Sequence, residues 1–263
     1  MAEDLNVEMK MKNRNLIPLL VKCLDRKSAD LLLLCVMFLK KLSIFEENKA
    51  EMISIPSLIP LLSNILTQVH VPLKDNTMRL LFNLSFDPKV REIMLSSPNL
   101  LLNCVEQLKD VQMFESTIKF LYQLSLSDHG KILLGETPNL LLFVFEYVIN
   151  FPGTRVGREL IALAINLCQI SRNVDAMIGL VPPTNSNTPS PPPINLQRLM
   201  ERFMQTHDSL LGKMIRNISS HDRHKGGFLP YIQSLISICT THSADESEVV
   251  VECLGILGNM NNL

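Results

Sequence analysis

Apolar residues recur along the chain in blocks of helical period, separated by short polar connectors. Asn76–Leu84 is apolar on most of its faces, which is typical of a helix buried on several sides. Leu58–Gln68 and Leu100–Asp110 are amphipathic, and shorter apolar segments follow polar connectors at Pro88–Leu95 and His129–Leu134. The pattern predicts an all-α chain in which a short helix, a middle helix and a long helix alternate.

A polar anchor triplet gives this pattern its period. The triplet Asn83-Leu84-Ser85 recurs in related form as Lys41-Leu42-Ser43, Gln123-Leu124-Ser125, Asn166-Leu167-Cys168, Asn217-Ile218-Ser219 and Asn259-Met260-Asn261. The middle residues of successive triplets are 42, 40, 43, 51 and 42 residues apart. The long interval contains the proline-rich run Val181–Pro193, 13 residues without which the spacing is 38. A period of about 40–47 residues with two or three helices is typical of armadillo and HEAT repeats.

A second landmark keeps the same register. The sequence LIPLL occurs at Leu16–Leu20 and again 42 residues later at Leu58–Leu62, and related segments begin at Leu100 and Leu140. Because one such unit cannot bury its apolar faces alone, neighbouring units stack into a solenoid. We therefore expect an armadillo-repeat α-solenoid, a right-handed superhelix of three-helix repeats. One domain, residues 1–263, would hold five to six repeats, the first incomplete.

Two features interrupt or end this array. The run Val181–Pro193 cannot be helical, because proline lacks an amide donor and clashes inside helices. We expect residues 181–193 to form a disordered surface loop, a tolerated insertion rather than a docking motif. The chain ends at Leu263 directly after a helix of the repeated type, without a polar capping helix, which favours part of a longer solenoid or a truncated product.

Composition excludes several classes of partner. The net charge is −1, so no basic surface favours nucleic acid or an anionic membrane. The longest apolar run, Leu31–Leu39, is too short for a bilayer, which needs about 20 residues. The charged N-terminus has no apolar signal region, so Asn83 and Asn217 are interpreted as repeat positions rather than glycan acceptors. These features predict a cytoplasmic protein without membrane insertion.

No constellation of catalytic or metal-binding residues is visible. Phosphate-binding, dinucleotide-binding and nucleophile-elbow glycine motifs do not occur. The group His221-Asp222-Arg223-His224 lacks metal-ligand spacing and is predicted to be a solvated turn. The six cysteines lie in apolar helical patterns without C-x-x-C, which favours reduced structural thiols over a disulfide framework. We expect no enzyme activity, cofactor, metal or small-molecule substrate.

Four stretches match more than the generic repeat. They are LLVKCLDRKSADLLLLCVMFLKKLSIFEENKAEM (Leu19–Met52), MRLLFNLSFDPKVREIM (Met78–Met94), LLGKMIRNISSHD (Leu210–Asp222) and EVVVECLGILGNM (Glu248–Met260). They resemble the armadillo region of the kinesin-associated protein family, the non-motor subunit of heterotrimeric kinesin-II. The resemblance covers nearly the whole chain apart from Val181–Pro193 and is most divergent between about Leu100 and Leu180.

The resemblance implies a non-catalytic scaffold. Family members bind the tails of the two motor polypeptides and connect the motor to cargo adaptors, including intraflagellar transport particles. The implied localisation is the microtubule cytoskeleton and the cilium or flagellum. Functions of the family's N-terminal region, later repeats and tail do not carry over, because this sequence lacks those parts. A generic adaptor of the importin or catenin kind is the alternative among binding proteins, and a catalytic helical-repeat domain is the alternative from another class.

Resemblance to armadillo proteins also implies a partner-binding groove. There the long helix lines the concave face, and a recurrent amide contacts the backbone of an extended peptide. The amides at this place are Asn83, Asn166 and Asn217, with Gln123 as a substitute, and the residues four positions earlier are Arg79, Lys119, Ala162 and Lys213. The basic residues, with no tryptophan in the chain, favour an acidic or phosphorylated segment over a basic import signal. The alternative is that the amides bond to neighbouring helix ends and the basic side chains are merely solvated.

Overall fold

The computed structural model describes residues 16–97, 99–179, 193–241 and 247–261. Within these ranges all the regular secondary structure is helical, as the apolar pattern predicts. Two compact units divide the chain, unit 1 at Met1–Gly130 and unit 2 at Lys131–Leu263. Residues 181–192 of the predicted loop lie outside the described ranges, and Pro193 directly precedes a helix.

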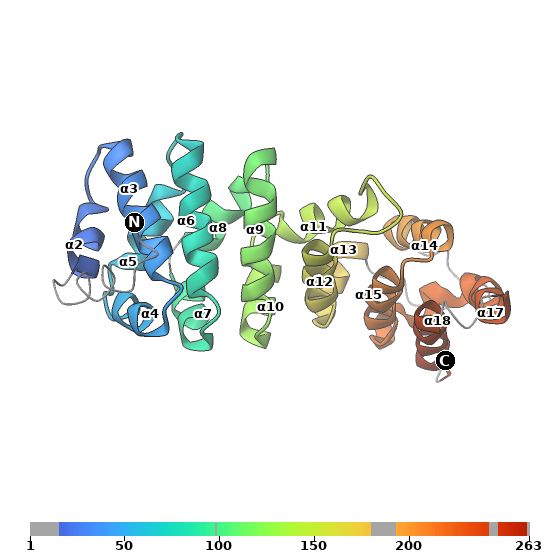
Figure 1. Cartoon of the computed structure of the whole chain (residues 1–263). Helices are drawn as coiled ribbons and strands as arrows, with labels where there is room; N and C mark the ends of the chain where they lie inside the picture. Colours follow the sequence, from blue (N-terminus) through green and yellow to red (C-terminus); the bar gives the residue numbers. More distant parts are fainter. Residues whose placement is uncertain (1–15, 98, 180–192, 242–246, 262–263) are drawn as a thin grey trace. The chain divides into compact units, whose positions relative to one another are not determined.

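Unit 1 repeats the order of short, middle and long helix. Its helices are α2 (Leu16–Cys23), α3 (Ala29–Leu42), α4 (Glu46–Ile53), α5 (Leu58–Ile65), α6 (Val71–Leu84), α7 (Pro88–Leu95), α8 (Leu100–Gln107) and α9 (Val111–Leu124). Helix α10 (Asp128–Glu136) begins at the end of unit 1 and continues into unit 2. The three long helices α3, α6 and α9 lie side by side, so α6 packs against both of the others (Figure 1).

The ends of these helices follow from the polar residues at the connectors. Asp87 and Asp110 each accept a hydrogen bond from the amide two residues later, at 2.8 and 3.0 Å, which caps α7 and α9. At the other end, the hydroxyl groups of Ser43, Ser85 and Ser125 each donate to the carbonyl oxygen three residues earlier at 2.7 Å. The serine of the anchor triplet therefore satisfies a carbonyl at the end of each long helix of unit 1.

The middle residue of every anchor triplet belongs to the core. These residues are Leu42, Leu84, Leu124, Leu167, Ile218 and Met260, and all are buried. The spacing of the triplets is thus the spacing of one buried core position per repeat. Asn83 and Asn217 lie half-buried within helices, which agrees with their interpretation as repeat positions.

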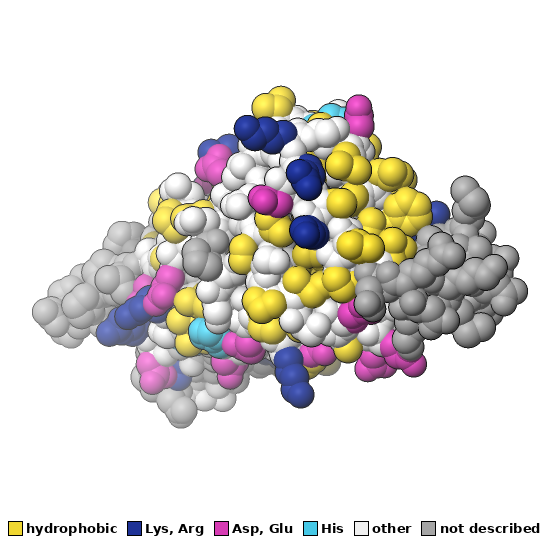
Figure 2. Space-filling view, turned by 90° about the vertical axis from the view of Figure 1, so that its left-hand side faces the viewer, with side chains coloured by type: hydrophobic (Ala, Val, Ile, Leu, Met, Phe, Trp, Pro, Cys, Tyr) yellow, Lys and Arg dark blue, Asp and Glu magenta, His cyan; other side chains and the backbone are white. Residues whose placement is uncertain are grey.

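The first long helix exposes apolar side chains where later helices carry polar ones. By the register of the anchor triplets, Leu34 and Met37 of α3 correspond to Asn76 and Arg79 of α6. Leu34 is 53% exposed and Met37 is 39% exposed. Figure 2 looks onto this end of unit 1 and shows hydrophobic side chains gathered on one part of it.

Unit 2 follows the same helix order less regularly. Its helices are α11 (Leu140–Ile149), α12 (Arg158–Leu167), α13 (Ser171–Ile178), α14 (Ile194–Thr206), α15 (Ser209–Ser219), α16 (Asp222–Lys225), the 3-10 helix η1 (Gly226–Tyr231), α17 (Ile232–Thr241) and α18 (Ser247–Asn259). The segment Phe228–Cys239 is divided between η1 and α17, with Pro230 inside η1, where it supplies no amide donor. The long helices α12, α15 and α18 pack in sequence, α15 against both of the others.

A buried carboxylate fixes the irregular connection between α11 and α12. Asp208 caps α15 by accepting from the Leu210 amide at 3.1 Å, and it also accepts from the Val156 amide at 3.0 Å. Arg202 donates to the carbonyl oxygens of Ile149 and Gly153, each at 2.9 Å. These bonds satisfy backbone groups of the connection that no helix satisfies.

The prediction of a solvated turn at His221–His224 is wrong. The His224 side chain is fully buried, with Nε2 2.8 Å from Asp175 Oδ1. His221 Nε2 lies 2.8 Å from the carbonyl oxygen of Cys168. Burial lowers the pKa of the His224 imidazole, although Asp175 acts in the opposite direction. Both rings reach back to the preceding repeat, a contact across about 50 residues that the local pattern does not reveal.

The lengths of the described helices bear on whether any of them could span a membrane. No single helix among them is long and apolar enough to cross a membrane, and one bent pair, α10 with α11, passes such a test on length and composition only. Most apolar side chains of α11 are buried in the core of unit 2, including Leu140, Val144, Phe145 and Val148.

Candidate functional site

A cavity of about 440 Å³ opens across the three long helices of unit 1, and we call it the unit 1 groove. Its lining comes from α3 and the turn after it (Lys40, Lys41, Ile44), from α6 (Asp75, Arg79, Phe82, Asn83) and from α9 (Gln112, Glu115, Ser116, Lys119). Three residues predicted for a partner-binding groove, Arg79, Asn83 and Lys119, therefore share one cavity. Gln123 is not among the lining residues, and its side chain is buried.

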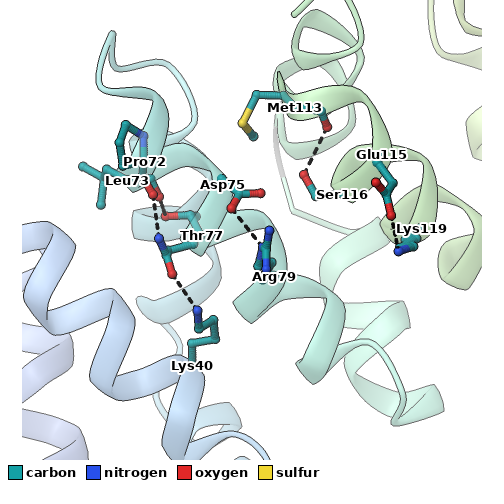
Figure 3. A network of polar contacts seen from close by, with 11 residues as sticks. Lys40, Pro72, Leu73, Asp75, Thr77, Arg79, Met113, Glu115, Ser116 and Lys119 are labelled. Carbon is teal, nitrogen blue, oxygen red and sulfur yellow. Dashed lines mark hydrogen bonds and ion pairs between the residues drawn. The ribbon is translucent and has the colours of Figure 1, made fainter. Parts of the chain in front are cut away.

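Cations outnumber carboxylates in the unit 1 groove. Arg79 and Lys119 each form an ion pair with the carboxylate four residues earlier on the same helix (Figure 3). Lys40 and Lys41 also line the groove, and neither forms an ion pair with a carboxylate among the described residues. Four cations against two carboxylates leave a surplus of positive charge.

The pKa of Lys40 reflects this surplus of positive charge. The Lys40 Nζ donates to Asn76 Oδ1 at 2.6 Å, across the contact between α3 and α6 (Figure 3). Partial burial lowers the pKa of the Lys40 ammonium, and the charge of Arg79 lowers it further, whereas Asp75 acts in the opposite direction. The positive form of Lys40 is therefore not fully compensated, so an anionic group placed beside it would be stabilised.

Asn83 bonds to the neighbouring long helix. Its Nδ2 donates to Ser43 Oγ at 3.0 Å and lies 3.4 Å from the carbonyl oxygen of Lys40. The alternative interpretation, that the amides bond to neighbouring helix ends, thus holds for the NH₂ group of Asn83. None of the hydrogen bonds among the described residues uses its carboxamide oxygen, which leaves an acceptor at the lining of the groove.

The amides of unit 2 make the same kind of bond. Asn217 Nδ2 donates to the carbonyl oxygen of Ile165 at 3.1 Å, from α15 to α12. Asn259 Nδ2 donates to Ser219 Oγ at 2.9 Å, from α18 to α15. Asn166 is half-buried on α12. The recurrent amide therefore joins successive long helices in both units, a structural role that does not depend on a partner.

An apolar edge borders the unit 1 groove. The rings of Phe82 and Phe86 meet edge to face, with centroids 5.0 Å apart, and Phe86 is 54% exposed. Ile44, Phe86 and Leu126 each directly follow the serine of an anchor triplet, and all three are exposed. An apolar residue at the same exposed place in three successive repeats offers a partner a hydrophobic contact beside the cations.

Some lining residues were not singled out by the sequence pattern. Lys41 occupies in its triplet the place of Asn83, so the register itself contains the signal for Lys41. In the sequence, Ile44 and Phe82 are ordinary apolar positions of a helical repeat. Only the structure shows that these two side chains line the groove.

The corresponding surface of unit 2 has a different charge. Lys213 lines a hollow of about 340 Å³ together with Glu248 and Glu252, so carboxylates outnumber lysine there. Arg216 Nη1 lies 3.1 Å from Glu252 Oε2. Burial raises the pKa of the Glu252 carboxyl, while Arg216 and Lys213 oppose that rise. At the fourth predicted position, Ala162 brings no charge, so the two predicted positions of unit 2 do not repeat the row of cations of the unit 1 groove.

The site contains no arrangement typical of a metal centre. Among the described residues, no three side chains of His, Cys, Asp or Glu gather in a way that could hold a metal ion. The lining of the unit 1 groove offers charged, hydrogen-bonding and apolar groups.

Comparisons with known proteins agree with this description. The family model of kinesin-associated protein matches residues 1–262. A computationally designed armadillo repeat protein for modular peptide recognition has a TM-score of 0.66 at 14% identity, covering 93% of this chain and 100% of that chain. A second designed armadillo repeat protein has a TM-score of 0.69 at 13% identity, covering 93% and 100%. An engineered protein has a TM-score of 0.71 at 13% identity, covering 94% and 96%. The structural likenesses confirm the armadillo α-solenoid fold.

Proposed function

Because the chain belongs to the kinesin-associated protein family, we propose that it is a non-catalytic adaptor that binds the tail segments of kinesin-II motor subunits. It would link these tails to cargo adaptors for microtubule-based transport, including intraflagellar transport, at the microtubule cytoskeleton and the cilium or flagellum. Family membership supports association with kinesin, and the armadillo fold supports binding of an extended peptide.

The observation that carries this proposal is the uncompensated charge of the unit 1 groove. Lys40 and Lys41 lie beside the acceptor oxygen of Asn83 and the apolar edge at Phe82. An extended segment with acidic or phosphorylated residues and an occasional apolar side chain matches all three features. We therefore propose that the acidic parts of the motor tails occupy the unit 1 groove.

Lys41→Glu tests this assignment. Lys41 is exposed and forms no ion pair with a described carboxylate, so reversing its charge disrupts no contact that holds the fold. We expect the affinity for fluorescently labelled motor tails to fall by about tenfold, equivalent to about 1.4 kcal/mol, with a weaker salt dependence. Binding is measured by fluorescence anisotropy at two ionic strengths.

Lys213→Glu is the matched control in unit 2. It also reverses an exposed lysine on a long helix, but one that lies beside Glu248 and Glu252. We expect this variant to bind motor tails as the unaltered protein does. Equal affinities for Lys41→Glu and the unaltered protein would remove the unit 1 groove as the binding site.

A binding measurement with a basic import-signal peptide distinguishes this proposal from an importin-like adaptor. The cationic surplus of the groove predicts no binding of such a peptide. Co-purification from ciliated cells, followed by mass spectrometry of the partners, tests the function in its cellular setting. Recovery of kinesin motor chains is the expected result, and recovery of import substrates alone would contradict the proposal.

A further inference from the structure

Helix α6 meets α3 with a side that is buried. Leu73 and Leu80 on this side are fully buried, and Asn76 between them accepts a hydrogen bond from α3. Residues three and four apart share one side of a helix, so these three residues mark the side of a long helix that receives the preceding one. Phe120 of α9, at the place of Leu80, is also fully buried.

Helix α3 exposes the same side. By the register of the anchor triplets, the residues at these three places are Leu31, Leu34 and Phe38, which we call the first face. Leu31 and Leu34 are exposed, and Phe38 is half-buried. Figure 2 shows hydrophobic side chains gathered at this end of unit 1. The first face therefore lacks the polar outer surface that an end repeat needs in water.

The other side of a long helix receives the following one. In α3 this side is marked by Val36, Leu39 and Ser43, which are fully buried. Ser43 accepts a hydrogen bond from Asn83 of α6, which shows that this side of α3 faces α6.

Helix α18 exposes this second side. The residues at the three places are Leu254, Leu257 and Asn261, which we call the last face. Leu254 is 55% exposed, Leu257 is half-buried and Asn261 is exposed. At the place of Leu254 the five earlier long helices have buried residues, namely Val36, Met78, Ile118, Ile161 and Gly212. Burial at this place therefore depends on a helix packed against it.

The two faces are complementary in the geometry of the repeat. Within each unit, a cation two places before the middle residue of the triplet reaches a polar group of the next long helix, as Arg216 reaches Glu252 and Lys40 reaches α6. At the two ends these places belong to Gly258 of α18 and Leu34 of α3. A Cβ on Gly258 would meet nothing within 4 Å, so this place has room for the Leu34 side chain. Stacking in register would leave no charge unpaired there.

We propose that the last face of one copy of this chain stacks on the first face of a second copy, with α18 and α3 packed as successive long helices. The contact removes the apolar side chains of both faces from water. It is heterologous, because the two copies use different faces, so further copies can add in the same way.

A second copy fits these faces better than an acidic motor tail does. The six residues of the two faces include no charged side chain, so they offer no ionic contact to an acidic segment. Leu34 and Leu254 also lie outside the lining of the unit 1 groove, so self-association is independent of the proposed binding of motor tails there.

Sedimentation velocity of the whole chain over a range of concentrations tests the proposal. The unaltered chain should grow beyond the monomer as concentration rises. Leu34→Lys in the first face and Leu254→Lys in the last face should each raise the dissociation constant at least about tenfold, because an ammonium group would lose its water in an apolar contact. Both leucines are more than half exposed in the single chain, so circular dichroism should show an unchanged fold.

An equimolar mixture of the two variants gives the sharpest result. Leu34→Lys keeps the last face and Leu254→Lys keeps the first face, so the mixture should form a dimer with the affinity of the unaltered contact and nothing larger. Leu102→Lys is the matched control. It replaces a leucine of α8 that is 45% exposed and belongs to neither face, and it should associate as the unaltered chain does.

Three outcomes would overturn the proposal. A chain that is monomeric at every concentration would mean that residues 1–15 of the same chain, or a different partner, cover the first face. Loss of association in only one of the two face variants would indicate a symmetric contact of one face with itself. An equal loss in Leu102→Lys would indicate association through exposed apolar residues in general.

Discussion

In unit 1 the long helices α3, α6 and α9 have 14 residues each, whereas in unit 2 the corresponding helices α12, α15 and α18 have 10, 11 and 13. Both units nevertheless keep the amide bond between successive long helices, from Asn83 in unit 1 and from Asn217 and Asn259 in unit 2. Helix length can therefore vary while the polar contact near the end of the long helix stays the same.

The charges around the amide position differ between the two units, although the amide bond itself is kept. The unit 1 groove has four cations against two carboxylates, and the hollow at Lys213 in unit 2 has one lysine against two carboxylates. The amide position thus has a role in the fold of both units, and the charges around it distinguish what each unit can bind. The charge of the unit 1 groove therefore favours the acidic segment that we propose, and the charge of the hollow at Lys213 does not.

The largest expected effect tests whether the two units unfold separately. Leu84→Asp places a charge in the core of unit 1, where the Leu84 side chain is fully buried. An unpaired buried charge should destabilise unit 1 by more than about 4 kcal/mol. Hydrogen exchange should show lost protection in α6, with protection retained in α15. Leu126→Asp, at a residue that is 45% exposed, is the control and should have little effect. Equal loss of protection in both units would show that they fold as one.

A pH titration from 7 through the range of the His224 imidazole should affect unit 2. The pKa of His224 is lowered from its ordinary value of 6.5 by burial, so below that pH the unfolded chain binds a proton that the folded chain does not. Unit 2 should lose stability as pH falls from 7 through this range, by at most about 1.4 kcal/mol per pH unit, and His224 should contribute nothing above it. His224→Gln keeps a donor for Asp175 and should flatten the profile. An unchanged profile would contradict the assignment.

The recurrent amide should contribute equally to the two units. Asn83→Ala removes the bonds to Ser43 Oγ and the Lys40 carbonyl oxygen, and Asn259→Ala removes those to Ser219 Oγ and the Arg216 carbonyl oxygen. Each variant should cost about 1 kcal/mol, because the bonds of one amide between long helices are lost. Denaturant unfolding followed by hydrogen exchange in α6 and α18 measures both costs. A cost in one unit only would show that the amide is not a common structural element.

The smallest expected effect on stability comes from a variant that changes the electrostatics of the unit 1 groove and leaves the fold intact. Arg79→Gln removes an exposed ion pair and should change stability by less than about 1 kcal/mol. It should also raise the pKa of Lys40, because the charge of Arg79 lowers that pKa. NMR titration of the Lys40 ammonium measures the change, and Lys213→Gln in unit 2 should not affect it. An unchanged Lys40 pKa in Arg79→Gln would mean that burial alone accounts for its value.

The repeat was predictable because it depends on local chemistry. Leu84 and its equivalents mark one buried contact per repeat, and Asp87 and Ser85 specify where helices begin and end, so the sequence predicts the α-solenoid and its helix order. The pairing of Arg79 with Asp75 was also accessible, because residues four apart share a helix face.

Features that depend on contacts between repeats were not predictable in the same way. His224 is polar and lies in a charged stretch, yet Asp175, 49 residues away, allows its burial. The donor half of Asn83 is engaged by Ser43 of another repeat, a contact that no helical periodicity contains. The charge surplus of the unit 1 groove likewise required knowing that Lys40 and Lys41 share a surface with Arg79.

The two polar bonds across the α3–α6 contact also have a mechanical consequence. Lys40 bonds to Asn76 in the first half of α6, and Asn83 bonds to Ser43 near its end, so the contact is fastened at two levels along the helix. A force that slides α3 along α6 must break both bonds together, whereas a force that opens the contact from one end breaks them in turn. Unit 1 should therefore resist sliding better than opening, and the direction of pull should set its breaking force.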